Sequence, residues 1–156
     1  MEVNMEFRPV IFSVNGQKFA VNISCVSGIE KVQNIVGVPN SNKDIKGIIN
    51  LRGEVIPIYS LRRHFNMPDA EYTESSQFVI VYTDDIRIGL EVDSVEEIHK
   101  VEEGMIVDVP VIIKNDETQM FDKVINIGGE LVLVINIEKI LKMEQMEDIK
   151  QLVENK

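Results

Sequence analysis

The side chains that could carry out chemistry in this sequence are few and far apart. His64 and His99 are the only histidines, and neither stands in a short-spaced set of metal ligands. Cys25, the only cysteine, has no neighbouring histidine and lies in an apolar segment, where a thiol packs as a small hydrophobic group. No glycine-rich phosphate-binding motif is present in the sequence. The sequence therefore predicts no covalent catalysis and no cofactor.

Three acidic pairs could bind a divalent metal: Asp84-Asp85, Glu96-Glu97 and Glu102-Glu103. They lack the alternating spacing with which a loop wraps a calcium ion, and each is typical of a turn or a solvated strand edge. One alternative is a metal-dependent enzyme that uses them. A melting temperature that rises with metal concentration would support that alternative.

The composition of the chain argues against nucleic acid and anionic lipid as partners. The chain has 156 residues, is 44% hydrophobic and carries a formal net charge of −10. Binding to nucleic acid or to an anionic lipid surface depends on clustered lysine and arginine, which this sequence lacks. No apolar run approaches the roughly 20 residues of a membrane span. The N-terminus lacks the features of a signal peptide, so a cytoplasmic location is expected.

The elements that position these residues are organised around a hairpin pattern. Two apolar runs, Ile45–Leu51 and Val55–Tyr59, flank a turn at Arg52-Gly53-Glu54. Ser60 is a good helix N-cap, so Leu61–Phe65 is predicted to be a short helix.

The same pattern recurs 76 positions later, over residues 121–141. The identities fall at the turn, where backbone chemistry is most demanding, and a capping residue is kept at position 136. The identical pairs are Asn50/Asn126, Gly53/Gly129 and Glu54/Glu130.

A second match supports a duplication. Residues 19–29 align with residues 88–98 at a shift of 69, and each segment reads as a strand followed by a capped turn. Ser24 and Asp93 are the predicted caps, and Asp93 with Glu96 has the spacing of a capping box. The sequence therefore predicts two copies of a small β unit that pack together.

The predicted division is a first unit over roughly 19–76, a second over roughly 77–141 and a C-terminal helix over 137–154, and it leaves open whether the units share the N-terminal strands in 7–18. The segment 66–76 is predicted to be a surface connector between the halves.

Two features suggest a binding surface. Val26, Ile29, Val95 and Ile98 are apolar at equivalent places of the two copies, and spacing leaves open whether they belong to the core or to a groove between the units. Arg52 has glycine as its counterpart in the second hairpin, so it would organise a salt bridge or a contact surface that occurs once per molecule.

Three blocks of the sequence closely resemble the CheW family, the adaptor proteins of bacterial chemotaxis. They are Gly47–Leu61, with its Asn-Leu-Arg-Gly run and Ile-Pro strand, Gly89–Val95 and Val134–Leu141. The resemblance covers Phe7 to about Leu141. It implies a single CheW-like domain over 1–156 in which two five-stranded SH3-like barrels are related by a pseudo-two-fold duplication. This all-β fold with short helices agrees with the repeat.

The resemblance also implies a non-enzymatic role with two partners. These are the regulatory domain of the histidine kinase CheA and the cytoplasmic tips of chemoreceptors, so the protein would be recruited to membrane-associated arrays. It assigns a receptor-binding groove and a kinase-binding surface. The groove residues are Val10, Ile23, Val26, Ile29, Val95 and Ile98. The hairpin residues, which would bind the kinase, are Val38, Ile45, Arg52 and Ile56.

Several points stay open at this level. Arg52 either supports the kinase surface or touches the partner. Gly28 stands where many relatives carry an acidic residue, which puts receptor contacts there in doubt. The absence of kinase and receiver segments favours a free adaptor over a domain of a larger family member. An adaptor of a non-chemotactic array, such as one for twitching motility, is the remaining alternative.

Overall fold

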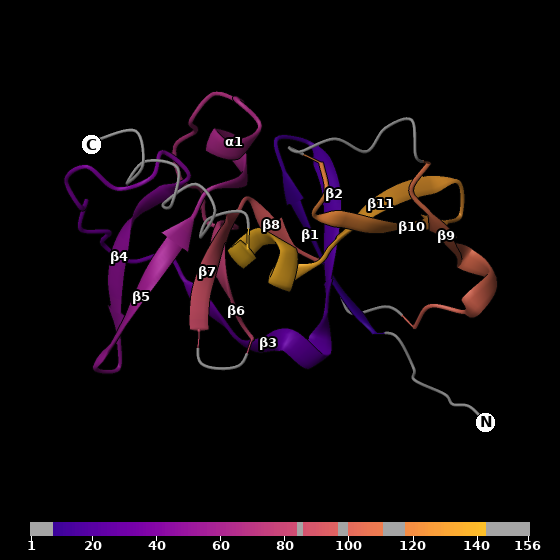
Figure 1. The fold of residues 1–156 in the computed structure, drawn as a ribbon, viewed down its shortest axis with the longest axis horizontal. Helices are drawn as coiled ribbons and strands as arrows, with labels where there is room; N and C mark the ends of the chain where they lie inside the picture. The colour runs from indigo at the N-terminus through magenta and orange to yellow at the C-terminus, as the bar shows by residue number, and fades with distance from the viewer. Residues whose placement is uncertain (1–7, 84–85, 97–99, 111–117, 143–156) are drawn as a thin grey trace.

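A computed structural model of the chain describes residues 8–83, 86–96, 100–110 and 118–142, and it consists of two sheets with few short helices (Figure 1). The five-stranded sheet has the order β3-β6-β7-β5-β4. Its strands are β3 (Val26–Lys31), β4 (Ile45–Leu51), β5 (Glu54–Tyr59), β6 (Gln77–Thr83) and β7 (Ile86–Val92).

The six-stranded sheet has the order β8-β1-β2-β11-β10-β9. Its strands are β1 (Pro9–Val14), β2 (Gln17–Asn22), β8 (Ser94–Val95), β9 (Ile106–Asp108), β10 (Phe121–Ile127) and β11 (Glu130–Ile135). The predicted fold class, all-β with short helices in two related units, is confirmed. The two-residue strand β8 adds the sixth strand.

The duplicated units exchange their first hairpins. The β1–β2 hairpin lies in the sheet of β10 and β11, whereas the β6–β7 hairpin lies in the sheet of β4 and β5. The parallel pairing of Ile58 with Gly89 has its counterpart in the pairing of Val134 with Ala20, as the shifts of 76 and 69 require. The sheets therefore divide the chain differently from the predicted boundary at 76/77. Periodicity locates strands but does not say which strands pair.

The turns explain which identities the repeat keeps. Arg52-Gly53 and Gly128-Gly129 have φ values of +50°, +89°, +58° and +91°, so both central residues of each hairpin turn are left-handed. Asn50 Oδ1 accepts a 2.9 Å bond from the Gly53 N–H, and Asn126 Oδ1 accepts the same 2.9 Å bond from Gly129. The asparagine and the glycine at each turn thus act together.

The predicted helix caps at 60 and 136 are confirmed. Ser60 Oγ accepts a 3.1 Å bond from the Arg63 N–H and begins α1 (Leu61–His64). Asn136 Oδ1 accepts a 3.3 Å bond from the Lys139 N–H and begins the helical turn at 137–142. The remainder of the predicted C-terminal helix lies outside the described residues.

The capping-box prediction at Asp93 is wrong. Ser94 and Val95 form β8 rather than a helical turn, and the Glu96 N–H donates a 2.7 Å bond to the carbonyl of Ile11. A neighbouring strand thus supplies the partner that a local cap would have supplied.

At the equivalent place in the first copy a single 3₁₀ turn does form, η1 (Ile23–Cys25). Its cap is Asn22, whose side chain accepts from the Ser24 N–H at 3.3 Å, and not the predicted Ser24.

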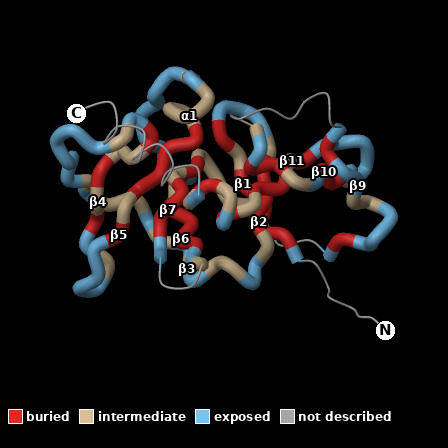
Figure 2. The backbone as a smooth tube through the Cα atoms, in the orientation of Figure 1, coloured by how far each residue is buried: buried red, intermediate tan, exposed pale blue. Residues whose placement is uncertain are grey.

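Each sheet unit has a core of its own, and a third core lies between the two units. Most central strands are therefore buried along most of their length (Figure 2). On β6, Phe78 and Ile80 pack inside the five-stranded unit, while Val79 and Val81 point into the shared core. On β1, Ile11 packs inside the six-stranded unit while Phe12 enters the shared core. This arrangement explains the nearly continuous apolar runs of both strands.

A stack of aromatic rings crosses the shared core. Phe65, which follows α1, lies 5.6 Å from Phe121 of β10. Phe121 lies 6.0 Å from Phe19, which lies 6.0 Å from Phe12. Each such pair stabilises the fold by about 0.5–1.5 kcal/mol beyond its buried area. The halves are therefore joined by packed side chains as well as by the chain.

Candidate partner-binding surfaces

Four of the predicted groove residues lie on the surface or at its edge. Ile23 of η1 and Ile29 of β3 are exposed, with 37% and 39% of their surface accessible. Val26 and Val95 are half-buried and pack against the shared core. Val95 pairs with Phe12 and Val26 pairs with Val81, so both are built on strands that carry the shared core.

The other two predicted groove residues, Val10 and Ile98, are not on the surface that the structure describes. Val10 is only 1% exposed and lies in the shared core, because it alternates with Ile11 along a strand that is buried on both faces. It is a packing residue, and its assignment to a contact surface is corrected. Ile98 lies outside the described residues.

Lys18 fastens the strand that carries Val95. Its Nζ lies 2.9 Å from a carboxylate oxygen of Glu96 and 2.8 Å from one of Glu130. The hydrogen bonds to Glu130 and Glu96 raise the pKa of Lys18 above its ordinary value. The lysine thereby ties the end of β8 to β2 and to the second hairpin.

The residues predicted to bind the kinase also divide into exposed and buried ones. Val38 is 42% exposed, and Ile45 is half-buried at the start of β4. Ile56 is completely buried within the five-stranded unit, so its assignment to a contact surface is also corrected. Its inward face follows from the alternation of β5, in which the neighbouring Val55 points outward.

A close approach of two segments shapes this surface. Val36 forms an isolated bridge with Ile48, with hydrogen bonds of 2.9 Å in both directions. The approach requires glycine at position 47, because a Cβ there would lie 2.4 Å from the Val36 carbonyl oxygen. Val36 is itself exposed and adds to the apolar surface beside Val38.

Arg52 extends from the hairpin turn towards β3. Its Nη2 lies 3.0 Å from Glu30 Oε2, and the two side chains form a forked contact. The hydrogen bond to Glu30 raises the pKa of the Arg52 guanidinium. The arginine side chain still has 74% of its surface in solvent. It therefore forms the predicted salt bridge and also remains available to a partner.

Gly28 lies beside this ion pair. A Cβ at position 28 would lie 3.0 Å from the carboxylate of Glu30, so the carboxylate occupies the space next to position 28. In this chain the acidic group beside Arg52 comes from a residue two positions further along β3.

A half-buried ion pair that the sequence did not reveal links α1 to the segment between β7 and β8. Arg62 of α1 lies 2.6 Å from Asp93, which also accepts a 2.8 Å bond from the backbone of Asn15 in the β1–β2 turn. Arg62 is largely buried and donates a further 2.9 Å bond to the Pro68 carbonyl. Residues 62 and 93 share no motif or periodic pattern, so sequence reasoning had no signal for this pair.

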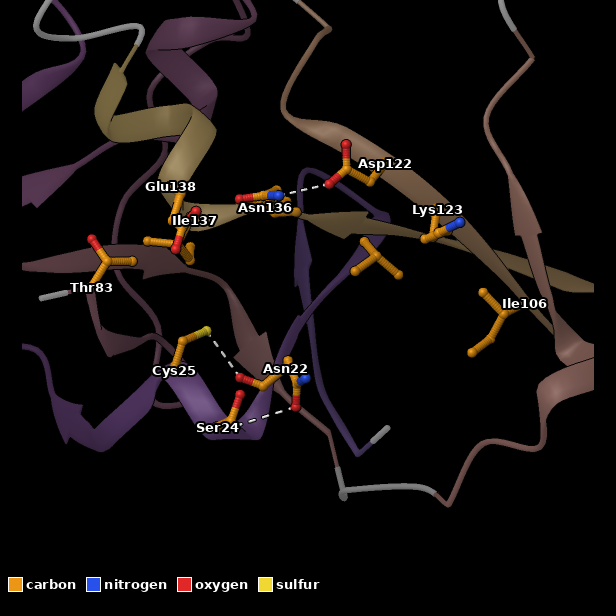
Figure 3. A pocket seen from close by; sticks show the side chains of 12 residues that line it. Asn22, Ser24, Cys25, Thr83, Ile106, Asp122, Lys123, Asn136, Ile137 and Glu138 are labelled. Atoms are coloured by element: carbon orange, nitrogen blue, oxygen red, sulfur yellow. Dashed lines mark hydrogen bonds between the residues drawn. The ribbon is translucent and has the colours of Figure 1, made fainter. Parts of the chain in front are cut away.

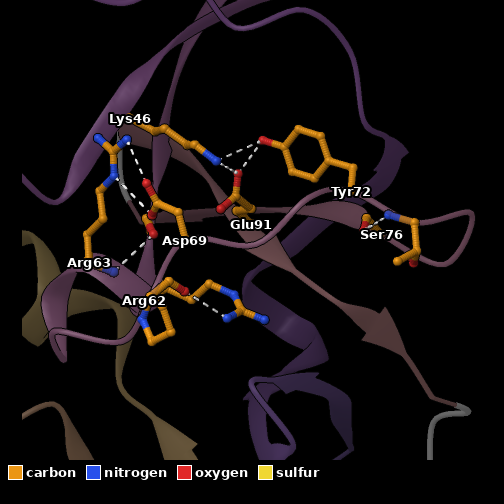
Figure 4. Close-up of polar contacts among 10 residues, drawn as sticks. Lys46, Arg62, Arg63, Asp69, Tyr72, Ser76 and Glu91 are labelled. Carbon is orange, nitrogen blue, oxygen red and sulfur yellow. Dashed lines mark hydrogen bonds and ion pairs between the residues drawn. The ribbon is translucent and has the colours of Figure 1, made fainter.

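The connector is fastened rather than free (Figure 4). The Tyr72 hydroxyl donates to the Glu91 carboxylate, which also lies 2.8 Å from Lys46 Nζ. Lys46 lies 4.9 Å from the centre of the Tyr72 ring. Burial and the Glu91 carboxylate raise the pKa of the Tyr72 phenol. Segment 66–76 is thus an ordered strap across the five-stranded sheet.

An open pocket of about 480 Å³ is lined by η1, the end of β6, strands β10 and β11 and the helical turn that follows them (Figure 3). Asn22, Ser24 and Cys25 line one side, whereas Asp122 and Glu138 come from β10 and the helical turn opposite. Burial raises the pKa of the Cys25 thiol, whose S–H donates to the Asn22 carbonyl. This thiol is therefore less nucleophilic than a free cysteine.

Within the described ranges, no three His, Cys, Asp or Glu side chains are placed to hold a metal ion. The part of the chain that the structure describes also contains no helix with the length and apolar character to cross a membrane. Three of the six acidic-pair residues of the metal hypothesis, Asp84, Asp85 and Glu97, lie outside that part.

Comparison with known proteins identifies the family. The model of the CheW-like domain matches residues 8–145. The chain belongs to the CheW family. The chemotaxis protein CheW of Bacillus subtilis (strain 168) is 30% identical over 146 residues, which cover 94% of each chain. CheW of Treponema pallidum (strain Nichols) is 26% identical over 157 residues, covering 97% of this chain and 92% of the relative.

A solved CheW structure has the same fold. The scaffolding protein TtCheW from Thermoanaerobacter tengcongensis superposes with a TM-score of 0.75 at 27% identity, covering 84% of this chain and 89% of that one. Sequence and structure therefore both show that this chain is a CheW-like domain.

Proposed function

We propose that the chain is a non-enzymatic adaptor that joins the regulatory domain of the histidine kinase CheA to the cytoplasmic tips of chemoreceptors. It would work in the cytoplasm, at receptor arrays on the membrane. The observation that carries the proposal is that two groups of apolar side chains around one packed core are exposed or half-buried. One comprises Ile23, Val26, Ile29 and Val95, and the other comprises Val36, Val38 and Ile45.

The first surface suits a receptor tip. Its apolar side chains come from η1, β3 and β8, at the outer strands of the two sheets. An amphipathic helix can lay its apolar face on such a surface, with side chains at helical spacing as anchors. The second surface adjoins the bridge between Val36 and β4 and suits a folded domain.

The test measures binding of a receptor tip fragment and a CheA regulatory domain from the same organism. Val95→Glu should weaken the receptor fragment at least tenfold and leave the kinase domain unaffected, while Val38→Glu should do the reverse. Val107→Glu is the matched control, because Val107 is an exposed apolar residue on β9, outside both surfaces.

Unchanged receptor binding by a folded Val95→Glu variant would refute the groove assignment. Binding only to the kinase and receptors of a twitching array would place the chain in the non-chemotactic alternative.

A further inference from the structure

The two halves differ in charge at equivalent positions of the repeat. On the first half, two ion pairs join the hairpin–helix block to β7 and the residue after it: Lys46 with Glu91 at 2.8 Å and Arg62 with Asp93 at 2.6 Å. In both pairs the base comes from the hairpin–helix block and the acid comes from the end of the strand that pairs with that hairpin in parallel.

At the equivalent positions the second half has acids in place of the bases and neutral residues in place of the acids. The shift of 76 places Asp122 and Glu138 where the first half has its two bases. The shift of 69 places Asn22 and Ser24 where the first half has its two acids. All four line the 480 Å³ pocket, which thus lies where the first half has its two ion pairs.

The pocket offers a carboxylate to a cation from outside. Asp122 already holds Lys139 at 2.5 Å and Asn136 at 2.7 Å. Lys123, the basic residue of the lining, is paired with Asp108. Glu138 forms no ion pair with any described residue, and in Figure 3 it stands across the pocket from Ser24. Glu138 is therefore the group that would receive a cation.

We propose that this pocket receives an arginine side chain from a partner protein. The apolar part of the lining, which includes Ile106, Ile135 and Ile137, suits the aliphatic stem of an arginine. The guanidinium would donate to Glu138 and to the side-chain oxygens of Asn22 and Ser24. This contact between molecules would be equivalent to the ion pair of Arg62 with Asp93 within the first half. Since the pocket has more room than one side chain needs, residues flanking the arginine would enter as well.

The first test uses the small molecule acetyl-arginine-amide and amide NMR of the full chain. Saturable shifts are expected at Ser24, Cys25, Thr83 and Ile137, and the neutral analogue acetyl-citrulline-amide should produce none. Glu138→Gln should weaken binding about three- to fivefold, as expected for an exposed ion pair. Glu103→Gln is the matched control, because Glu103 is exposed on η2 outside the pocket. Equal binding of citrulline, or unchanged binding by Glu138→Gln, would overturn the proposal.

A second variant builds the missing clamp. Ser24→Asp combined with Glu138→Arg copies the Asp93–Arg62 pair into the second half and should fill the pocket. The double variant is expected to melt at a higher temperature than either single variant and to lose binding of acetyl-arginine-amide. Retained binding in a folded double variant would contradict the proposed site. Both tests are independent of CheA and of receptors.

Discussion

Arg52 occupies a left-handed backbone position that its counterpart in the repeat fills with glycine. A residue with a Cβ is strained in this conformation, and an exposed ion pair such as that with Glu30 adds little stability. Arg52→Gly should therefore leave the midpoint of urea denaturation close to that of the wild type. Because the guanidinium is exposed, the variant should nevertheless bind the kinase domain more weakly, as measured by calorimetry.

The control for Arg52 is Glu30→Gln, which breaks the same ion pair but keeps the arginine. It should retain affinity for the kinase domain if Arg52 touches the partner. Equal losses in both variants would show instead that the ion pair shapes the surface.

At the scale of the element, Arg62 links α1 to the segment between β7 and β8. Arg62→Ala would remove a largely buried guanidinium together with its bonds to Asp93 and to the Pro68 carbonyl, and we expect it to lower the free energy of unfolding by about 2 kcal/mol. Urea denaturation measures this loss.

The adjacent Arg63→Ala is a matched control on the same helix. Arg63 lies 3.4 Å from Asp69 and both side chains are more exposed, so the expected loss is below 1 kcal/mol. Equal losses for the two arginines would show that the bonds of Arg62 do not hold this link.

The connector strap gives a prediction about alkaline pH. The pKa of Tyr72 is raised above its ordinary value of 10.0 in the folded state, so its contribution is complete below pH 10 and is lost as the pH rises further. Tyr72→Phe should therefore be less stable than wild type at pH 8 by about 1 kcal/mol, and the difference should shrink above pH 10. Tyr82→Phe, which removes a hydroxyl bonded to the Ser24 backbone, controls for general alkaline effects. A difference that is constant from pH 8 to pH 11 would contradict this role.

The sequence predicted the positions of turns and helix caps better than it predicted which strands and side chains lie next to one another. Turn residues such as Asn50 and Gly53, and the caps Ser60 and Asn136, act on backbone within a few positions, so local patterns locate them. Val10 was misassigned because a strand that is buried on both faces shows no alternation that separates core from surface, and Ile56 was misassigned because the family resemblance does not say which face of β5 a residue occupies. The Arg62–Asp93 pair depends on the hairpin exchange, which no local pattern encodes.

At the scale of the whole molecule, the exchange makes the halves interdependent. Residues 26–92 contain every strand of the five-stranded sheet, yet much of their apolar surface packs in the shared core. The members from this segment are Tyr59, Leu61, Val79, Val81, Ile88, Leu90 and Val92. Exposing them costs roughly 10 kcal/mol, which is comparable with the whole stability of a domain. The isolated fragment 26–92 should therefore not fold cooperatively, and a dispersed amide spectrum with a sharp melting transition would contradict this.

The central claim is that one chain holds two partners at once on separate surfaces. Light scattering after size-exclusion chromatography of the chain with a receptor tip fragment and a CheA regulatory domain tests it most directly. We expect a single ternary species whose mass equals the sum of all three components. Two binary complexes in the same mixture, with each partner displacing the other, would contradict it.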